Sequence, residues 1–270
     1  MIDPEKTLFI YEIKSSLPDF LPDPPNTLIG VWNEDDFSYV FFLEPEDHYV
    51  EGLCLSCDAI LSSRHEMRYK DWQEGIPDVG LSIAGQKFVP FRENAHDENS
   101  IFLDPSVVFG DGNHPTTVAC IEFMVDIMKK DEVKSVLDLG SGSGILALTA
   151  AGLGASKVVA ADKNRLAVQA TRQNVSRNGF DDIIETLEGE ARIFLNRGYD
   201  LVMANLPFSV LRDIVVLKET SLIKTWVISG INSDQALTLK TLLQEQGFEI
   251  KNEKLTPPWT TFVAAQKDLE

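Results

Sequence analysis

A short apolar run that breaks into three glycines is the feature that most constrains how this chain folds. Residues 136–144 read Val-Leu-Asp-Leu-Gly-Ser-Gly-Ser-Gly, and Asp162 follows 22 residues after Gly140, at the end of a second apolar run. A strand, a glycine turn, a helix, a second strand and a carboxylate form the nucleotide-ribose pocket of an open α/β sheet. Glycines let such a turn lie close against a ligand. The pattern therefore predicts a ligand site at the turn and at Asp162.

The spacing within the turn distinguishes two classes of ligand. A dinucleotide site favours Gly-x-Gly-x-x-Gly, whereas the third glycine here comes one residue early, at Gly144. Asp138 precedes the turn, where its charge would disfavour a pyrophosphate, although a turn residue that bonds its own backbone also explains it. A cationic ligand without phosphates fits this acid. We therefore expect S-adenosylmethionine, bound by Asp138, Gly140 and Gly142, with Asp162 on its ribose.

The length and hydropathy of the chain indicate a globular protein. The chain has 270 residues, of which 44% are hydrophobic, enough for one large domain or two smaller ones. No uninterrupted apolar stretch approaches the ~20 residues that span a membrane. The first residues lack the basic and apolar regions of a signal peptide. We expect a cytoplasmic protein without membrane contact.

The net charge restricts the partners of the protein. The formal charge is -18, and an acidic surface of this kind repels a phosphate backbone, so nucleic acid is a poor partner. A basic protein or peptide would be attracted to it. The alternative is that the charge serves only to keep the protein soluble.

The three cysteines do not indicate a disulfide framework. Cys54 and Cys57 form a C-x-x-C motif with His48 and His65 on either side, a set that contains enough ligands for zinc. The histidine spacings are irregular and the thiols lie among apolar residues, a context typical of buried structural cysteines. We expect no metal.

Three segments follow one another along the chain. Residues 1–65 are expected to form a small α+β domain that recognises the substrate, with strands at 7–13, 28–32 and 38–43 and a helix over 48–63. Residues 66–100 are interpreted as a connector with a helix start at 69–73, strands around 80–91 and a polar loop at 93–100.

Residues 101–270 alternate regularly between strand and helix patterns. Helices are expected from 113, over 145–153, 164–179, 208–219 and 232–246, and strands over 134–139, 157–161, 183–187, 199–204 and 225–229. Such alternation predicts a doubly wound, mostly parallel seven-stranded α/β sheet. Two final strands, 247–255 and 259–266, are expected to add an antiparallel strand at its edge.

Two further motifs accompany the glycine turn. Residues 109–117 read Phe-Gly-Asp-Gly-Asn-His-Pro-Thr-Thr, and residues 202–205 read Val-Met-Ala-Asn. These two motifs, the glycine turn and Asn178-Gly179 occur in the order and spacing of the PrmA-type ribosomal protein methyltransferases. The chain resembles this family over residues 101–267 and in the connector Lys70–Gln73. The resemblance implies the sheet of a class I S-adenosylmethionine-dependent methyltransferase.

The resemblance also implies site residues and a reaction. By position, the methyl-donor contacts of the family correspond to Thr117, Gly140, Asp162 and Asn205. The implied activity is N-methylation of lysine or N-terminal amines of a protein such as a ribosomal protein, which leaves S-adenosylhomocysteine as product. Thr117 has the alternative role of capping its helix, and Asn205 that of a turn residue.

The acceptor is less sharply defined, because residues 205–208 read Asn-Leu-Pro-Phe where the family usually continues Asn-Ile-Leu. This segment looks like the Asn-Pro-Pro-aromatic loop of enzymes that methylate amide or exocyclic amino groups. A glutamine side chain or a small molecule is therefore an alternative acceptor. A third class, a binding module or an NAD enzyme, fits Gly144 and Asp138 badly. The first 65 residues match the substrate-binding module of the family poorly.

The mechanism requires a neutral amine, since free lysine has a pKa of ~10.4. The hypothesis is that Asn205 is the catalytic residue that orients the amine while the proton leaves through water. His114 is a candidate base, although a histidine before Pro115 at a helix start is better explained structurally. Phe109 and Phe208 either form walls of the transfer site or belong to the core.

Overall fold

The computed structural model describes residues 2–3, 5–18, 21–34, 36–72, 76–77, 79–91 and 100–267. The chain divides into two compact units, Met1–Glu74 with Asn164–Leu166, and Gly75–Lys163 with Ala167–Glu270. Gln73 of the expected connector helix and residues 93–99 of the expected loop lie outside the described residues. In the part of the chain that is described, no helix has the length and hydropathy needed to cross a bilayer.

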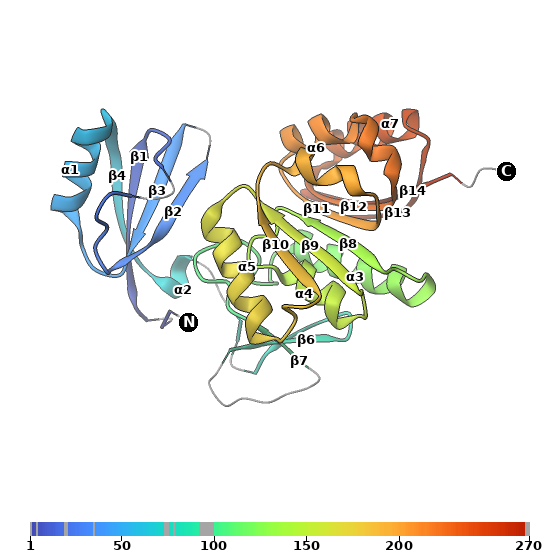
Figure 1. The fold of residues 1–270 in the computed structure, drawn as a ribbon, viewed down its shortest axis with the longest axis horizontal. Coiled ribbons are helices and arrows are strands. Elements are labelled where there is room, and N and C mark those ends of the chain that lie inside the picture. Colours follow the sequence, from blue (N-terminus) through green and yellow to red (C-terminus); the bar gives the residue numbers. More distant parts are fainter. Residues whose placement is uncertain are drawn as a thin grey trace. The chain divides into compact units, whose positions relative to one another are not determined.

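The first unit is a four-stranded antiparallel sheet with a helix on one face (Figure 1). Its strand order is β2-β3-β1-β4. The elements are β1 (Thr7–Lys14), β2 (Leu28–Glu34), β3 (Phe37–Phe42), α1 (Asp47–Cys57), β4 (Ile60–Arg68) and α2 (Tyr69–Trp72). Val50 and Leu53 of α1 pack on Tyr11, Val40 and Phe42 of the sheet, which gives this unit a hydrophobic core of its own.

The helix expected over 48–63 is wrong beyond residue 57. Asp58 adopts the left-handed region at φ 51°, and its N–H donates to the Cys54 carbonyl, which ends α1. The chain then pairs antiparallel with β1 from Ile60 to Arg68, so the sheet continues past residue 65. Nearly all of β4 is exposed. Because an edge strand buries little, its sequence lacks the alternation that marks a strand, and backbone pairing alone defines it.

The second unit contains the doubly wound sheet, and the fold class predicted from the sequence is confirmed. Its strand order is β10-β9-β8-β11-β12-β14-β13. The strands are β8 (Ser135–Leu139), β9 (Lys157–Asp162), β10 (Ile184–Glu188), β11 (Tyr199–Asn205), β12 (Ile223–Asn232), β13 (Phe248–Thr256) and β14 (Trp259–Gln266). The helices are α3 (Pro115–Lys130), α4 (Ile145–Gly152), α5 (Arg165–Arg177), α6 (Phe208–Val215) and α7 (Ser233–Glu245), with 3-10 turns η1 (Ala191–Arg197) and η2 (Lys218–Leu222).

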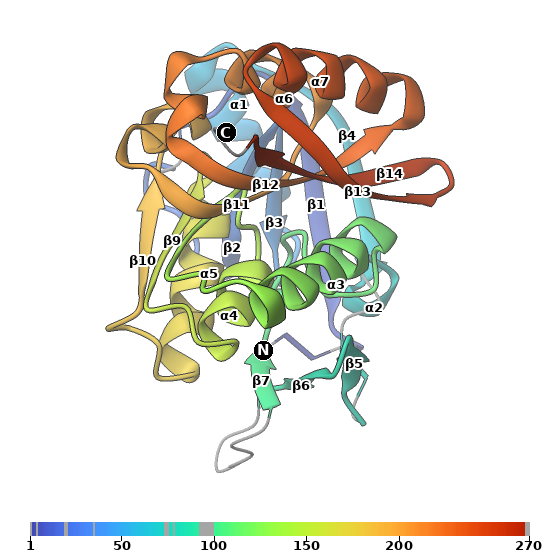
Figure 2. The same cartoon turned by 90° about the vertical axis from the view of Figure 1, so that its right-hand side faces the viewer.

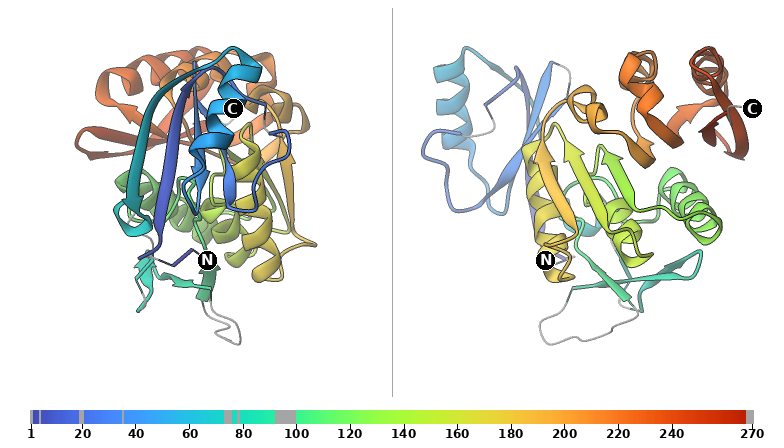
Figure 3. Two further views of the ribbon diagram at one scale, coloured as in Figure 1. Left: turned by 90° about the vertical axis from the view of Figure 1, so that its left-hand side faces the viewer. Right: turned by 45° about the vertical axis from the view of Figure 1, so that its right-hand side comes forward.

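Helices cover both faces of this sheet (Figures 2 and 3). α3 and α4 pack on one face around Ile121, Leu148 and Met203, and α6 and α7 pack on the other around Trp226 and Leu239. A small sheet of β5 (Leu81–Ile83), β6 (Gln86–Pro90) and β7 (Ser100–Leu103) joins the core on the α3 and α4 side. The sequence pattern does not predict β7, because its four residues are too few to show alternation and directly follow the polar residues 93–99.

We expected the antiparallel strand at the edge of the sheet, but it lies inside the sheet. β14 pairs antiparallel with β12 on one side and with β13 on the other, and β13 forms the edge. The burial of the two strands explains this order: five successive residues of β14 are buried, whereas most of β13 is exposed. A strand buried on both faces belongs inside a sheet, and a half-polar strand tolerates the edge.

Candidate functional site

The registers of the parallel strands bring the predicted site residues to one end of the sheet. Leu139 pairs with Ala161 of β9 and Ala204 of β11, so the residues that follow, Gly140, Asp162 and Asn205, leave neighbouring strands at the same level. Ligands of open α/β sheets bind outside the carboxyl ends of the strands. The geometry therefore assembles one site from segments far apart in sequence.

The glycine turn has a backbone that other residues adopt only with strain. Gly140, Gly142 and Gly144 have φ values of 72°, 55° and 84°. A Cβ on Gly142 would lie 2.5 Å from the Phe109 carbonyl oxygen. The Gly140 N–H donates to the Ala161 carbonyl at 2.8 Å, which ties the turn to the end of β9. The glycines are thus required both by dihedral angle and by close packing.

Side chains and backbone from two directions hold the turn. Ser143 donates its N–H to the Phe109 carbonyl at 2.9 Å and its hydroxyl to the Gly110 carbonyl at 2.6 Å. On the opposite side, Thr171 of α5 donates to the Gly142 carbonyl at 2.9 Å. The 109–110 segment and α5 therefore hold the turn between them.

Asp162 is fixed to the turn it was expected to accompany. Its Oδ2 accepts the Gly142 N–H at 3.1 Å. This bond joins the carboxylate at the end of β9 directly to the backbone of the turn.

Asp138 is fully buried, and its hydrogen bond differs from the one expected of a turn residue. Oδ2 accepts the N–H of Ala147, in the first turn of α4, at 3.1 Å. α4 has no side-chain cap of its own, so β8 supplies it. Burial raises the pKa of Asp138 to about 7, and the Asp162 charge adds to the rise. The carboxyl is thus close to titration at neutral pH.

Two buried oxygens of this region have no hydrogen-bond partner among the described residues: Asp138 Oδ1 and Thr117 Oγ1. Thr117 is 1% exposed, in the first turn of α3. Burial raises the pKa of the Cys120 thiol, one helical turn further on, to about 12, and the nearby Asp138 carboxylate contributes to this rise. Since residues three apart share a helix face, Thr117 lies on the α3 face that carries Cys120. A buried polar atom without a hydrogen bond lowers the stability of the fold. A polar ligand that bonded Asp138 Oδ1 and Thr117 Oγ1 would remove this cost.

Asn205 belongs to a short relay at the start of α3. Its Nδ2 donates to Thr116 Oγ1 at 3.1 Å, and that hydroxyl lies 2.7 Å from His114 Nδ1. The same ring nitrogen accepts the Thr116 N–H and caps the helix. Burial lowers the pKa of His114, so the ring is neutral and accepts through Nδ1. The geometry therefore supports the structural role of His114, which caps α3, over the role of catalytic base.

Aromatic rings surround this relay. The His114 ring packs edge-on against Phe109, with centroids 5.2 Å apart, and against Trp259, at 5.4 Å. Phe109 is 47% exposed, so it is not a core residue. Phe208 instead packs against the core on the α6 and α7 side. No sequence pattern singles out Trp259.

The cysteine motif carries no chemistry visible in the structure. Cys54 is buried in the core of the first unit and Cys57 is exposed. Burial raises the pKa of the Cys54 thiol. The described part of the chain holds no group of three or more His, Cys, Asp or Glu side chains placed to bind a metal ion.

Sequence reasoning missed the polar residues that organise the site from a distance. Thr116, Ser143, Thr171 and Asn174 all bond to site residues or to the turn. A signal was present, because Thr171 and Asn174 of α5 and Asn178 just after it recur at helical spacing, where apolar residues would be expected on a face turned to the core.

The strand order, with a glycine turn and a strand-end carboxylate at the carboxyl edge, defines a doubly wound domain of the class I methyltransferase type. The structure is similar to that of a ribosomal protein L11 methylase from Lactobacillus delbrueckii subsp. bulgaricus, with a TM-score of 0.56 and 28% identity over 68% of this chain and 95% of that one. The methyltransferase domain of METTL16, at 16% identity and a TM-score of 0.51 over 63% of this chain and 74% of that one, shares the fold.

Residues 66–267 match the family described as Ribosomal protein L11 methyltransferase (PrmA), and the chain belongs to this family. Relatives named ribosomal protein L11 methyltransferase include one from Desulforamulus reducens, 36% identical over 71% of this chain, and one from Exiguobacterium sp., 34% identical over 62%. These matches span 57% and 54% of the relatives, so the chain covers little more than half of their length. The resemblance seen in the sequence is confirmed.

Proposed function

We propose that this protein is an S-adenosylmethionine-dependent methyltransferase that methylates lysine or N-terminal amines of a ribosomal protein. The observation that carries the proposal is two buried oxygens without a partner among the described residues. Asp138 Oδ1 belongs to the residue two positions before the glycine turn, and Thr117 Oγ1 belongs to the residue after Thr116, whose hydroxyl accepts from Asn205. A ligand with polar, charged ends completes such a site, whereas an apolar ligand would leave both atoms unsatisfied. Membership of the PrmA family supports the same ligand.

The residues present fit this donor. Asp162 offers a carboxylate to the ribose hydroxyls, and Gly140 and Gly142 allow the backbone to approach the ligand closely. The buried Asp138 carboxylate favours the cationic end of the donor over a phosphate. Thr117 supplies a hydroxyl to its methionine end. When bound, the donor supplies a methyl group activated by a sulfonium.

The protein then aligns a neutral amine with that methyl group. Because Asn205 Nδ2 donates to Thr116, the amide is oriented and its Oδ1 is the atom that accepts an N–H from the amine. Alignment of this kind accounts for a large part of many rate enhancements. His114 Nδ1 is engaged as the helix cap, so we assign the departing proton to water.

The acceptor assigned here is a protein amine. The relatives are named for ribosomal protein L11, and the net charge of -18 suits a basic partner. With a ribosomal substrate, the protein would act in the cytoplasm. The alternative acceptor, a glutamine side chain or a small molecule, rests on Asn205–Phe208 and requires Phe208 to stack on a planar group. Phe208 is partly buried against the core, which leaves less of its ring for such stacking and favours the lysine or N-terminal amine.

Calorimetry tests the donor. S-adenosylhomocysteine is expected to bind with micromolar affinity and NAD not to bind. The Asp162→Ala variant should lose most of this affinity, with Asp200→Ala as a control at the opposite end of the strands. Binding of NAD alone would overturn the methyltransferase assignment.

Radiolabelled donor tests the acceptor. The protein is incubated with purified ribosomal protein L11, with a cell extract and with free glutamine. Label is expected in L11 and, after acid hydrolysis, in methylated lysine or an N-terminal residue. Label in glutamine or only in the small-molecule fraction would favour the alternative.

A further inference from the structure

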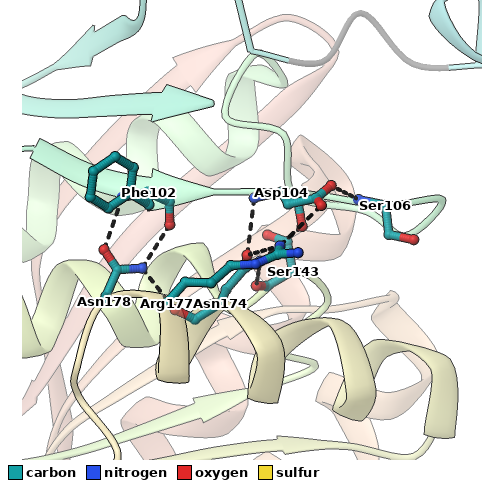
Figure 4. Close-up of polar contacts among 7 residues, drawn as sticks. All are labelled: Phe102, Asp104, Ser106, Ser143, Asn174, Arg177 and Asn178. Atoms are coloured by element: carbon teal, nitrogen blue, oxygen red, sulfur yellow. Dashed lines mark hydrogen bonds and ion pairs between the residues drawn. The ribbon is translucent and has the colours of Figure 1, made fainter. Parts of the chain in front are cut away.

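Helix α5 and the residue that follows it carry two asparagines that bind the strand leading into the 109–117 segment (Figure 4). Asn178 accepts the Phe102 N–H at 2.8 Å and donates to the Phe102 carbonyl at 2.7 Å. Asn174 accepts the Asp104 N–H at 3.0 Å and donates to the Asp104 carbonyl at 2.9 Å. Side chains four apart share a helix face, so the two amides pair with the backbone of residues 102 and 104 as a neighbouring strand would.

The two asparagines differ in one further contact. Asn174 Nδ2 also donates to the Ser143 carbonyl in the glycine turn, at 2.9 Å. The second N–H of Asn178 instead goes to the Asn174 carbonyl in the last turns of α5, at 2.7 Å. Asn174 is fully buried. An amide has two N–H donors, so Asn174 uses both of them to join the 102–106 segment to the turn.

The connection continues through Ser143. This residue bonds to the Phe109 and Gly110 carbonyls, so the turn contacts both ends of the stretch from Asp104 to Gly110. An ion pair between Arg177 and Asp104, at 3.0 Å, supports the first end (Figure 4). A displacement of the turn must therefore move the segment that leads to His114 and Thr117.

We propose that Asn174 is a positioning residue that couples the glycine turn to the 104–117 segment, so that donor binding at the turn orders the residues beside the acceptor. The inference rests on the proposed methyltransferase function. Its physical basis is that Asn174 joins the two segments through one fully hydrogen-bonded, buried amide, and buried networks whose members are all satisfied are rigid.

The matched pair Asn174→Asp and Asn178→Asp tests the coupling. Each substitution turns an oxygen toward two carbonyls, but only the first breaks a contact to the glycine turn. Affinity for S-adenosylhomocysteine is measured by calorimetry well below the melting temperature of each variant. Asn174→Asp is expected to weaken binding about tenfold, the equivalent of one buried hydrogen bond, with a parallel rise in the KM for the donor. Asn178→Asp should bind within about twofold of the parent protein.

Hydrogen exchange provides the readout that a general loss of stability would not produce. In the parent protein, S-adenosylhomocysteine is expected to protect amides of both 140–144 and 104–114. In Asn174→Asp, the protection of 104–108 should be lost, whereas residues 109–110 keep their direct bonds to Ser143. Equal effects of the two substitutions, or unchanged protection of 104–108, would overturn the coupling. If Asn174→Asp does not fold, the serine pair, Asn174→Ser and Asn178→Ser, is measured in the same way. Absence of binding by the parent protein would instead reject the proposed function itself.

Discussion

At the scale of single residues, Asp138 combines a structural and a chemical role. One carboxylate oxygen caps α4 through Ala147, and the other has no partner among the described residues. Its pKa is raised to about 7, chiefly by burial. The fold therefore bears a cost for ionising this group, and a cationic ligand would relieve it.

This cost predicts the pH dependence of Asp138→Asn. The folded pKa lies above the unfolded value, so the unliganded protein loses stability as the pH rises from about 4 to about 7. The amide that replaces the carboxyl has no charge to bury, so the variant should lose less stability over this range in urea titrations. Affinity for S-adenosylhomocysteine should rise with pH through about 7 in the parent protein only. Parallel stability curves for the two proteins would contradict the assignment.

Gly142→Ala is expected to abolish donor binding. The new Cβ would lie 2.5 Å from the Phe109 carbonyl oxygen, a backbone atom that cannot move without displacing the segment. Gly179→Ala is the control, because Gly179 also has a positive φ, 67°, but no atom lies within 4 Å of its Cβ position. The control should cost about 1 kcal/mol of folding free energy and leave binding intact. Calorimetry with both variants separates close contact from backbone strain.

Asn205→Ala is expected to lower kcat about 10²-fold, the size of effect that a small misplacement of a reactant produces. Affinity for S-adenosylhomocysteine should largely survive, because the glycine turn and Asp162 remain. Thr116→Val removes the hydroxyl that orients the Asn205 amide and should lower kcat in the same direction but less. Unchanged turnover in Asn205→Ala would reject its catalytic role.

The positions of candidate site residues in the fold were predictable from sequence only where a local pattern carries them. Gly140, Gly142 and Asp162 were identifiable because a turn and a strand end have a fixed spacing. The hydrogen-bond partners of Asn174 and Thr116 were not, because they lie 31 or more residues away in sequence. Such contacts depend on how strands and helices pack, which spacing does not encode.

At the scale of elements, Asp200 joins three strands at the end of the sheet opposite the site. It accepts hydrogen bonds from the Lys134 and Ser135 N–H groups and from Lys224. Although burial acts to raise its pKa, these bonds lower it to about 2. The ionised carboxylate thus stabilises the starts of β8, β11 and β12 together.

Asp200→Asn should reduce the free energy of unfolding at pH 7 by about 2–3 kcal/mol, the stabilisation that a carboxylate of such low pKa contributes. The folded pKa lies below the unfolded value, so this stabilisation is present above about pH 4 and is lost as the pH falls toward about 2. Urea titrations at pH 7 and pH 3 should show a difference between the two proteins that shrinks with acidity. A difference independent of pH would contradict the ionic origin.

The order of elements was predictable, but not every boundary or neighbour. Strong apolar periodicity predicted β8, β9, β11, α3 and α4 correctly. The first residues of β4, 60–63, were predicted as helix, and the rest of the strand was missed because residues 60–68 are mostly exposed and carry no alternation. The position of β14 inside the sheet was missed because a hairpin pattern shows only that β13 and β14 pair with each other. It does not show which of the two also pairs with β12.

At the scale of the whole molecule, negative charge is concentrated in the first part of the chain. Residues 1–74 contain 16 acidic and 5 basic residues, and so carry -11 of the net -18. Attraction to a basic partner acts over about 10 Å at ~0.1 M salt. If the substrate is the basic protein proposed above, this distribution should favour its encounter with the first unit.

Salt should therefore affect the two substrates differently. The KM for a basic protein substrate is expected to rise severalfold between about 50 and about 300 mM sodium chloride, because screening weakens long-range attraction. The KM for S-adenosylmethionine should change little. Steady-state kinetics with each substrate varied in turn measures both. A salt-independent KM for the protein would mean that the charge serves solubility alone.

The position of β14 also matters while the chain is being made. β12 pairs with β14 on one side, so that side stays open on the ribosome until residues 259–266 have emerged. At ~5–20 residues per second the interval lasts a few seconds, and an open strand edge is a template for pairing with other chains. Slow codons between 233 and 258 would prolong the exposure, and we expect them to lower the yield of soluble protein without changing one amino acid.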